Sequence, residues 1–394
     1  MITTSKNQQL RLDILRKVYY KDCVSLTELS KLTSKSLPVI TSAVNEIITE
    51  GYLIEHGLAP STGGRRPAMF LFNKEKPRYV VSVAMDQLVS RIAIYDLSKQ
   101  CIYPIQNIKL NPFEDKEGLT KLISFIDSHI SKSGLNRDHI LGIGVGMPGF
   151  VNSDKGINES FFFTERISLR DYLSSQIKLP VYIDNDSCLI AQAELRFGAG
   201  IGIKELMVVN IGWGTGLGMI VNGQIFKGHS GYAGEFSHIP LSQSNNLCSC
   251  GKRGCLEVET SVLTMVSKAK AAIHDGAESI MSELFQDPDD LPGDGFLKAA
   301  GKGDPLALSI LAESAFQLGK GLSTLIHIMN PERIVLSGRG AVVGKMFLPA
   351  IQQAIYEFSI PKIAEQTTLV VSDLGNEAEL IGAASLVIDN SMFE

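Results

Sequence analysis

Three cysteines and one histidine with the spacing of a metal site lie in the second half of the chain: His238, Cys248, Cys250 and Cys255. Three sulfurs and an imidazole form a closed set of four ligands, which suits tetrahedral zinc in a structural site. Two glycines between the last two cysteines let the backbone wrap tightly around an ion. The alternatives are free buried cysteines or a disulfide. We expect one structural zinc ion per chain, because half of the six cysteines fall within eight residues.

Two further motifs, a glycine-rich loop and an aspartate, could take part in ligand binding. Residues 211–218 read IGWGTGLG, and such a loop either cradles phosphate with its N–H groups or simply forms a hairpin. Asp186 follows a predicted strand, in the crevice where α/β proteins bind ligands, and its carboxylate could act as a general base. Aspartate is equally apt as a helix N-cap, so both roles stay open.

Composition and charge restrict the class of protein. The chain has 394 residues, enough for two or three domains, and 44% of them are hydrophobic, as in ordinary globular proteins. The net charge is −5, but residues 1–73 hold nine basic and six acidic side chains and are net +3, so the remainder carries −8. This split permits nucleic-acid contact at the N-terminus and argues against it elsewhere.

The sequence predicts a cytoplasmic protein. The first residues lack the apolar segment of a signal peptide, and no stretch approaches about 18 uninterrupted apolar residues, so we expect no membrane insertion. The remaining cysteines, Cys23, Cys101 and Cys188, are far apart in sequence and look like isolated thiols. Isolated thiols fit a reducing compartment.

Residues 1–73 have the pattern of a winged helix-turn-helix. Apolar side chains at helical spacing predict a first helix over roughly 7–21. Ser25 and Glu28 form a capping box that opens a second helix. Pro38 lies near the start of a third helix, where its missing N–H is harmless. Two short strands then flank a glycine-rich loop, which completes the pattern.

The third helix and this loop supply the candidate DNA contacts. Short polar side chains suit base edges or phosphates, and arginines on a glycine-rich loop could enter a minor groove. The alternative is a small helical dimerisation module with a solvated loop. We predict that operator DNA is contacted by Ser36, Thr41, Ser42, Asn45, Arg65 and Arg66.

From about residue 74 the chain has the short strands and glycine punctuation of a two-lobed α/β nucleotide-binding fold. We expect residues 74–190 to form the first lobe, joined by the C-terminal segment from about 375 to 394. Residues 191–374 then form the second lobe, which carries the zinc site.

Taken together, the motifs resemble the ROK family (repressors, open reading frames, kinases). They are Asp184-Asn185-Asp186, the Gly214-Thr215-Gly216 loop, Gly234-Glu235-x-x-His238 and the cysteine motif that ends in Glu257. The winged helix and its arginine-bearing loop are similar to the repressor branch of the family. The resemblance covers essentially the whole chain and implies an actin-like, sugar-kinase fold with a sugar between its lobes.

The resemblance also implies the site residues. In kinases of the family, the aspartate that matches Asp186 takes a proton from a sugar hydroxyl. The residues that match Asn185, Glu235, His238 and Glu257 hold the sugar hydroxyls. His238 would therefore serve twice, with one ring nitrogen on zinc and the other facing the sugar.

One departure from the kinase pattern bears on activity. The family's kinases have an Asp-x-Gly-Gly-Thr loop that handles the ATP phosphates. Here Ala84 takes the position of that aspartate, Asp86 is displaced by two residues, and Gln87 and Leu88 carry side chains where backbone must approach phosphate. We therefore expect absent or vestigial ATP turnover and no catalytic residue, with Asp186 kept as a vestigial base position.

A second departure concerns the choice of sugar. The kinases usually place an Asn-Leu-x-Trp-like stretch against the sugar, whereas this chain has three phenylalanines at residues 161–163. They could line a pocket, but we expect them to face the core. Glucose-like sugars, pentoses and sugar phosphates all remain open as effectors.

These observations predict a sugar-responsive transcriptional regulator, a repressor of carbohydrate uptake or catabolism genes. We expect a homodimer or a dimer of dimers in which a sugar or sugar phosphate favours one lobe arrangement and so changes the spacing of the DNA-binding heads. The alternatives are a ROK sugar kinase with an appended DNA-binding domain and a regulator governed by a protein partner.

Overall fold

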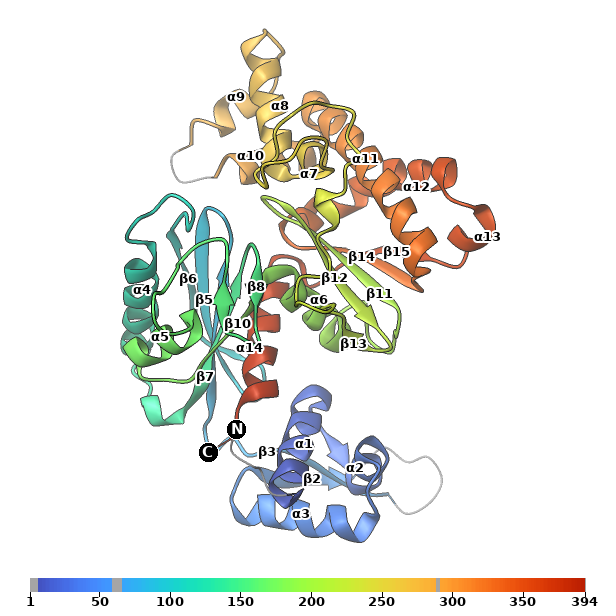
Figure 1. Ribbon diagram of the computed structural model, residues 1–394. Helices are drawn as coiled ribbons and strands as arrows, with labels where there is room; N and C mark the ends of the chain where they lie inside the picture. Colours follow the sequence, from blue (N-terminus) through green and yellow to red (C-terminus); the bar gives the residue numbers. More distant parts are fainter. Residues whose placement is uncertain (1–5, 59–65, 288–290, 394) are drawn as a thin grey trace.

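The computed structural model describes residues 6–58, 66–287 and 291–393. Figure 1 shows a small N-terminal unit beside two larger lobes, each of which is built around a five-stranded sheet. Within the described ranges, no helix combines the length and apolarity that crossing a bilayer demands.

The N-terminal unit has three helices and a three-stranded antiparallel sheet of order β1-β3-β2, the layout of a winged helix. Its elements are α1 (Lys6–Lys21), β1 (Val24–Ser25), α2 (Leu26–Thr33), α3 (Leu37–Thr49), β2 (Leu53–Leu58) and β3 (Ala68–Phe72). The Ser25 hydroxyl accepts a hydrogen bond from the Glu28 N–H at 3.2 Å, as a helix N-cap should. Pro38 lies in the first turn of α3, as predicted.

The first lobe holds a mixed sheet of order β10-β7-β4-β5-β6. Its strands are β4 (Tyr79–Met85), β5 (Val89–Asp96), β6 (Cys101–Lys109), β7 (Ile140–Met147) and β10 (Val181–Asn185), with α4 (Gly118–Ser133), α5 (Leu169–Ile177) and the short pair β8 (Val151–Asn152) and β9 (Ile157–Asn158). Strands β4, β7 and β10 run parallel. Their carboxyl ends therefore meet at one edge of the sheet, where α/β proteins bind ligands.

The second lobe repeats this plan with a sheet of order β13-β12-β11-β14-β15. Its strands are β11 (Leu206–Ile211), β12 (Thr215–Val221), β13 (Gln224–Ile225), β14 (Arg333–Ser337) and β15 (Thr368–Val371). Its helices are α7 (Glu257–Thr260), α8 (Val262–His274), α9 (Met281–Leu284), α10 (Pro292–Gly301), α11 (Pro305–Met329), α12 (Gly344–Phe358) and α13 (Pro361–Ala364). The buried side chains of β11 and β14 join those of α8, α10 and α11 in the largest apolar core of the molecule.

Two helices occupy the junction between the lobes. Helix α6 (Asp186–Phe197) packs against β11 and β12 of the second lobe, and α14 (Ala378–Asn390) packs against α6 and against β4 and β7 of the first. The C-terminal segment thus lies on the first lobe. The lobe boundary expected at residue 190 falls inside α6.

The segment after α14 completes the core of the N-terminal unit. Phe393 is 1% exposed, and its ring stacks on Phe72 with centroids 6.3 Å apart. The Tyr52 hydroxyl donates to the Phe393 carbonyl at 2.5 Å, and the Tyr20 hydroxyl donates to Asp389 at 2.7 Å. These contacts fasten the N-terminal unit to the end of α14.

Candidate ligand cleft and metal centre

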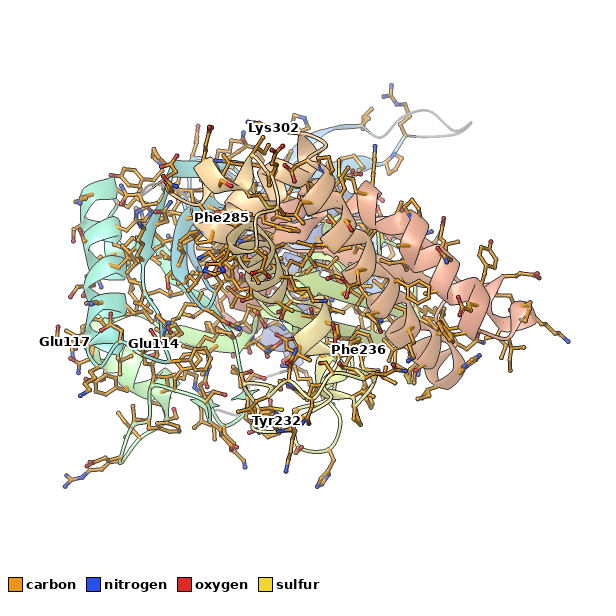
Figure 2. The ribbon with its side chains drawn as sticks, turned by 90° about the horizontal axis from the view of Figure 1, so that it is seen from above. Glu114, Glu117, Tyr232, Phe236, Phe285 and Lys302 are labelled. Carbon is orange, nitrogen blue, oxygen red and sulfur yellow. The ribbon has the colours of Figure 1, made fainter. Side chains whose placement is uncertain are left out.

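A cavity of about 850 Å³ lies between the two lobes. The first lobe contributes the ends of β4, β7 and β10, and the second contributes the turn between β11 and β12 and the segment before the cysteines. Figure 2 shows Glu114 beside α4 of the first lobe, Phe236 on the side of the second lobe, and Tyr232 between them in this view. The side chains predicted to hold a sugar all line this cavity: Asn185, Asp186, Glu235, His238 and Glu257.

The turn from β10 into α6 shows that Asp186 is not the N-cap of this helix. The N-cap is Asn185, whose side-chain oxygen accepts from the N–H groups of Ser187 and Cys188 at 3.0 and 3.2 Å. Its amide nitrogen donates to the Gly149 carbonyl at 3.2 Å, so both ends of this side chain are already bonded. Asp186 begins the helix instead, and capping by Asn185 leaves its carboxyl in the cavity.

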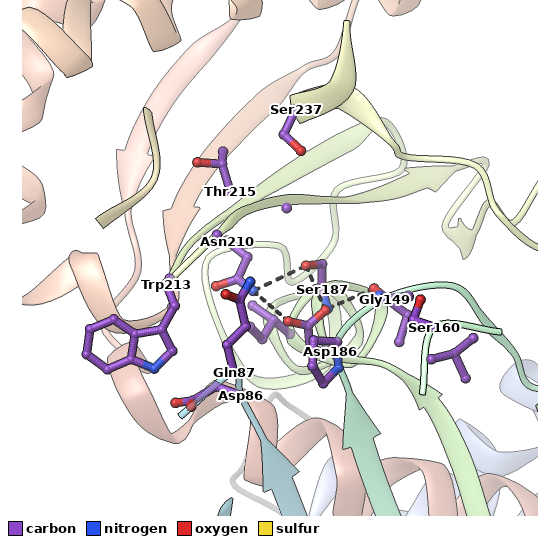
Figure 3. Close-up of a pocket in the computed structure, with 18 of the residues that line it drawn as sticks. Asp86, Gln87, Gly149, Ser160, Asp186, Ser187, Asn210, Trp213, Thr215 and Ser237 are labelled. Atoms are coloured by element: carbon purple, nitrogen blue, oxygen red, sulfur yellow. Dashed lines mark hydrogen bonds between the residues drawn. The ribbon is translucent and has the colours of Figure 1, made fainter. Parts of the chain in front are cut away.

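Asp186 lies on the cavity floor near Asn210 and Ser187 (Figure 3). Its Oδ1 accepts from the Ser187 N–H at 2.7 Å, and the Asn210 amide lies 3.4 Å from its Oδ2. Burial, supplemented by the nearby charge of Asp86, raises the pKa of Asp186 to about 6. A carboxyl of this kind can accept or donate a hydrogen bond near neutral pH.

Two glutamates extend the polar lining on the second lobe. Glu257 accepts from the Thr215 N–H of the glycine-rich loop at 2.9 Å, and burial raises its pKa to about 7. Glu235 has its pKa raised by partial burial and by the charge of Asp186, although 41% of its side chain stays exposed. The glycine-rich loop therefore holds a protein carboxylate.

The four predicted zinc ligands converge at the edge of the cavity. The ligand atoms of His238, Cys248, Cys250 and Cys255 all lie within 4.8 Å of one another. The sulfurs of Cys250 and Cys255 are 3.6 Å apart, too far for a disulfide, and all six cysteines are free. A tetrahedral zinc ion with Zn–S bonds of about 2.3 Å would hold its sulfurs about 3.8 Å apart, so the donor set fits this metal.

The two ring nitrogens of His238 have different neighbours. Its Nδ1 lies 3.5 Å from the sulfur of Cys248, and its Nε2 lies 3.6 Å from a carboxylate oxygen of Glu235. The imidazole thus lies between the cysteine cluster and Glu235, and both His238 and Cys250 line the cavity.

The β4–β5 turn is held by internal contacts. The Asp86 carboxylate accepts from the N–H groups of Leu88 and Val89 at 2.8 and 2.7 Å. Ala84 is buried within β4, where it is 1% exposed. Backbone donors at this turn are therefore bonded to a side chain of the protein.

Arg339, whose role was not predicted from the sequence, follows β14 at the start of the 3-10 helix η3 (Arg339–Val343). Its guanidinium donates to Asp294 at 2.6 Å and, across the gap between the lobes, to Asp86 at 3.0 Å. It also lies 4.4 Å from the ring centre of Trp213, which is 2% exposed. The ion pair between Arg339 and Asp86 thus bridges the two lobes.

Glu379, at the start of α14, is another cavity residue that sequence reasoning missed. Its side chain is 8% exposed, and Oε2 lies 3.7 Å from Arg91. Its Oε1 is buried without a hydrogen-bond partner. Burial, with the charge of Asp186 adding to it, raises the pKa of this carboxyl well above its ordinary value. An apolar helix pattern in the sequence conceals such a residue.

The phenylalanine stretch only partly meets its expectation. Phe161 is 3% exposed and packs in the first-lobe core, as expected, and Phe162 packs against that core. Phe163 is 75% exposed, so it does not face the core.

The predicted DNA contacts on α3 differ in their accessibility. Ser36, Ser42 and Asn45 are exposed. Thr41 is half-buried, and its hydroxyl donates to the Leu37 carbonyl at 2.8 Å. Ser42 and Asn45 are three residues apart and therefore share a face of the helix.

The structure describes one of the two loop arginines that were predicted to contact DNA. Arg66 is exposed, and its guanidinium lies 3.4 Å from the Leu58 carbonyl. Arg65 lies outside the described residues.

Comparison with known sequences finds relatives of two kinds. The xylose repressor of Caldicellulosiruptor bescii is 28% identical over 97% of this chain and 96% of its own length. The DNA-binding transcriptional dual regulator NagC of Escherichia coli is 29% identical over 92% and 87%. The glucokinase of Halalkalibacterium halodurans is 32% identical over 69% of this chain and 84% of its own length.

Solved structures divide in the same way. A ROK family transcriptional regulator described as a homologue of E. coli MLC aligns over 97% of this chain and 96% of its own, with a TM-score of 0.77 and 24% identity. A ROK family glucokinase from Streptomyces griseus, in complex with glucose and AMPPNP, aligns over 78% and 98%, with a TM-score of 0.66 and 25% identity. The ROK family model itself matches residues 91–390. The chain belongs to the ROK family.

Proposed function

We propose that the protein is a sugar-responsive transcriptional repressor of carbohydrate uptake or catabolism genes. The observation that carries this proposal is a winged-helix unit fastened to a two-lobed ROK body, in a chain that repressors match over nearly its whole length. In this proposal residues 1–73 bind operator DNA, residues 74–190 with 375–394 form the first lobe, and residues 191–374 form the second.

The sugar binds in the cavity between the lobes. Asp186, Glu235 and Glu257 offer carboxyl groups to its hydroxyls, and His238 offers Nε2. Asn185 shapes the site chiefly as the cap of α6, because its amide is bonded on both sides. The affinities of a sugar for the open and closed lobe arrangements must differ if the sugar is to shift their equilibrium.

Helix α14 is the proposed route from the cavity to the DNA. Glu379 at its first turn lines the cavity, and Asp389 at its last turn bonds to the N-terminal unit. A change in lobe angle therefore moves the attachment point of the winged helix. In a homodimer this movement changes the distance between two DNA-binding heads, as an operator with two half-sites would sense.

We infer that the chain does not turn over ATP. Asp86 occupies the backbone donors of the β4–β5 turn, and Arg339 lies bonded between Asp86 and Asp294. Phosphoryl transfer depends on positioning and charge stabilisation of the phosphates, which this arrangement does not supply.

The metal in this proposal is a structural zinc ion held by His238, Cys248, Cys250 and Cys255. When bound, zinc contributes folding free energy and orients the segment that carries Glu235 and Glu257. Reduced thiols are required for this binding, in agreement with a cytoplasmic protein.

The test is DNA selection from a random duplex library by the full chain, followed by binding of the selected sequence with and without sugars. We expect a selected two-half-site sequence whose affinity changes at least tenfold with one sugar. A Ser42→Glu/Asn45→Glu variant places two like charges against the phosphates and should lose this binding while its unfolding temperature is kept. Absence of sequence selection, or robust transfer of phosphate from ATP to a sugar by the wild-type chain, would refute the proposal.

A further inference from the structure

The charged lining of the cavity is unbalanced. Among the described residues that line it, seven are aspartate or glutamate and two are arginine, and none is lysine. The inner carboxyls come from both lobes and from α14: Asp86, Asp186, Glu235, Glu257 and Glu379. A ligand that brings further negative charge meets repulsion from several sides.

Neither arginine is free to meet an anion. Arg91 donates to the Asn376 carbonyl at 2.6 Å and lies 3.7 Å from Glu379. Arg339 is bonded to two carboxylates at 2.6 and 3.0 Å. An anionic ligand would have to break these pairs and leave without partners one buried carboxylate, Glu379, and two half-buried ones, Asp86 and Asp294, which is costly.

Three backbone elements that commonly bind phosphate are also filled by the protein's own oxygens. The turn after β4 gives the N–H groups of Leu88 and Val89 to Asp86. The N-terminus of α6 gives the Ser187 N–H to Asn185 and to Asp186. Phosphate binding at such places needs the same N–H groups to be open.

The third element is the glycine-rich loop, in which Thr215 gives its N–H to the Glu257 carboxylate at 2.9 Å. Each of the three elements therefore already holds a carboxylate. Among the described residues of the cavity wall, three have a buried polar atom without a hydrogen-bond partner. Besides the hydroxyl of Tyr232, these atoms include two of opposite kind: the indole N–H of Trp213 and Oε1 of Glu379. One is a donor and the other is a carboxyl oxygen, and a hydroxyl group can bond to either.

We propose that the cavity takes an unphosphorylated polyhydroxy ligand, a neutral or amino sugar, and rejects sugar phosphates and nucleotides. This inference rests on the proposed function, because it names the chemical class of the effector. Hydroxyl groups both donate and accept, so they match carboxyl groups in either protonation state. An ammonium group would be attracted by the same lining.

The experiment measures binding of matched pairs to the full-length protein by calorimetry and thermal shift. The probes are glucose, N-acetylglucosamine and glucosamine, each beside its 6-phosphate, together with xylose, xylobiose and cellobiose. We expect at least one unphosphorylated sugar to bind, with any 6-phosphate partner at least tenfold weaker. A 6-phosphate that binds as tightly as its parent overturns the proposal, and so does the absence of binding by every unphosphorylated probe.

A variant tests the physical reason. Asp86→Asn keeps an oxygen for the Leu88 and Val89 N–H groups and removes the charge that neutralises Arg339 across the gap. The preference for the parent sugar over its 6-phosphate should narrow at least threefold. Glu357→Gln makes the same charge change on the exposed face of α12, away from the cavity, and should leave the preference unchanged. An unchanged preference in Asp86→Asn, or an equal narrowing in Glu357→Gln, contradicts the proposal.

The outcomes separate this inference from the proposed function, since ligand binding is measured without DNA. A neutral sugar that binds in preference to its phosphate but leaves DNA binding unaltered refutes the repressor mechanism and leaves the ligand class standing. A sugar phosphate that binds more tightly than its parent and releases the operator refutes the ligand class and leaves the repressor mechanism standing.

Discussion

The two walls of the cavity are held in place by different kinds of contact. On one wall, a histidine and three cysteines bring their ligand atoms within 4.8 Å of one another, as a metal site would require. On the other wall, Arg339 bonds to both Asp86 and Asp294. In our proposal the first wall is completed by a zinc ion, whereas the contacts of the second come from the chain itself. The contrast teaches that the two walls should respond differently to removal of a metal.

Loss of the metal should have the largest effect. Cys255→Ser removes a buried ligand, and we expect it to destabilise the fold by more than about 3 kcal/mol. Zinc content and thermal unfolding, each with and without a chelator, check this. Wild-type protein should fall to the stability of the variant when chelator is added.

The matched control is Cys101→Ser, because Cys101 is an exposed free cysteine on β6. Zinc content and unfolding temperature should both be unchanged. If Cys255→Ser also keeps its zinc and its stability, the first wall is not a metal site and the contrast disappears.

Removing the Arg339 contacts of the second wall should destabilise the protein less than loss of the metal. Arg339→Ala leaves Asp86 and Asp294 without their shared partner and removes the cation from the face of Trp213. We expect a loss of about 2 kcal/mol in the free energy of unfolding, insensitive to chelator. Denaturant unfolding measures it, with the exposed Lys345→Ala as a control expected to lie within about 0.5 kcal/mol of wild type. A chelator-dependent loss would show that the two walls are coupled.

Replacing Asp186, on the cavity floor between the walls, should change the free energy of unfolding least. This change should be stabilising, in contrast to the two above. Burial raises the pKa of Asp186 to about 6, so the folded protein keeps a proton that the unfolded chain releases near pH 4. The contribution of Asp186 to the free energy of unfolding therefore falls as pH rises from about 4 to about 6. Asp186→Asn cannot ionise, and we expect it to stabilise the protein by roughly 1–2 kcal/mol at pH 7 and by less at pH 5.

Asp184→Asn is the comparison, two residues earlier on the same strand end. Asp184 is paired at 2.5 Å with Lys227 of the second lobe, so its replacement should destabilise the protein at pH 7. Denaturant unfolding at pH 5 and pH 7 distinguishes the two variants. Equal losses in both would mean that Asp186 is held as a stabilising charge.

Local spacing explains what could be predicted from the sequence. The zinc ligands lie close together in the chain, and the winged helix depends on a cap and a proline whose effects reach only a few residues. The N-cap role considered for Asp186 belongs to Asn185, one position earlier, and asparagine is as good a cap as aspartate.

Pairing across the lobes could not be predicted in this way. Asp86 and Arg339 are 253 residues apart and come from different sheets. The replacement of the phosphate loop was visible as missing glycines, but its physical substitute was not. Glu379 was hidden for the same reason, since only the fold shows that the first turn of α14 reaches the cavity.

The packing of Phe393 has a consequence for how the chain is made. The N-terminal unit leaves the ribosome first, yet Tyr52 bonds to a residue 341 positions later. Domains generally fold as they emerge. The core of the N-terminal unit therefore lacks the ring of Phe393 until the segment after α14 has been synthesised. Translation that stops before α14 therefore yields an N-terminal unit without the ring of Phe393 in its core. The core of this unit is completed only after both lobes have been synthesised.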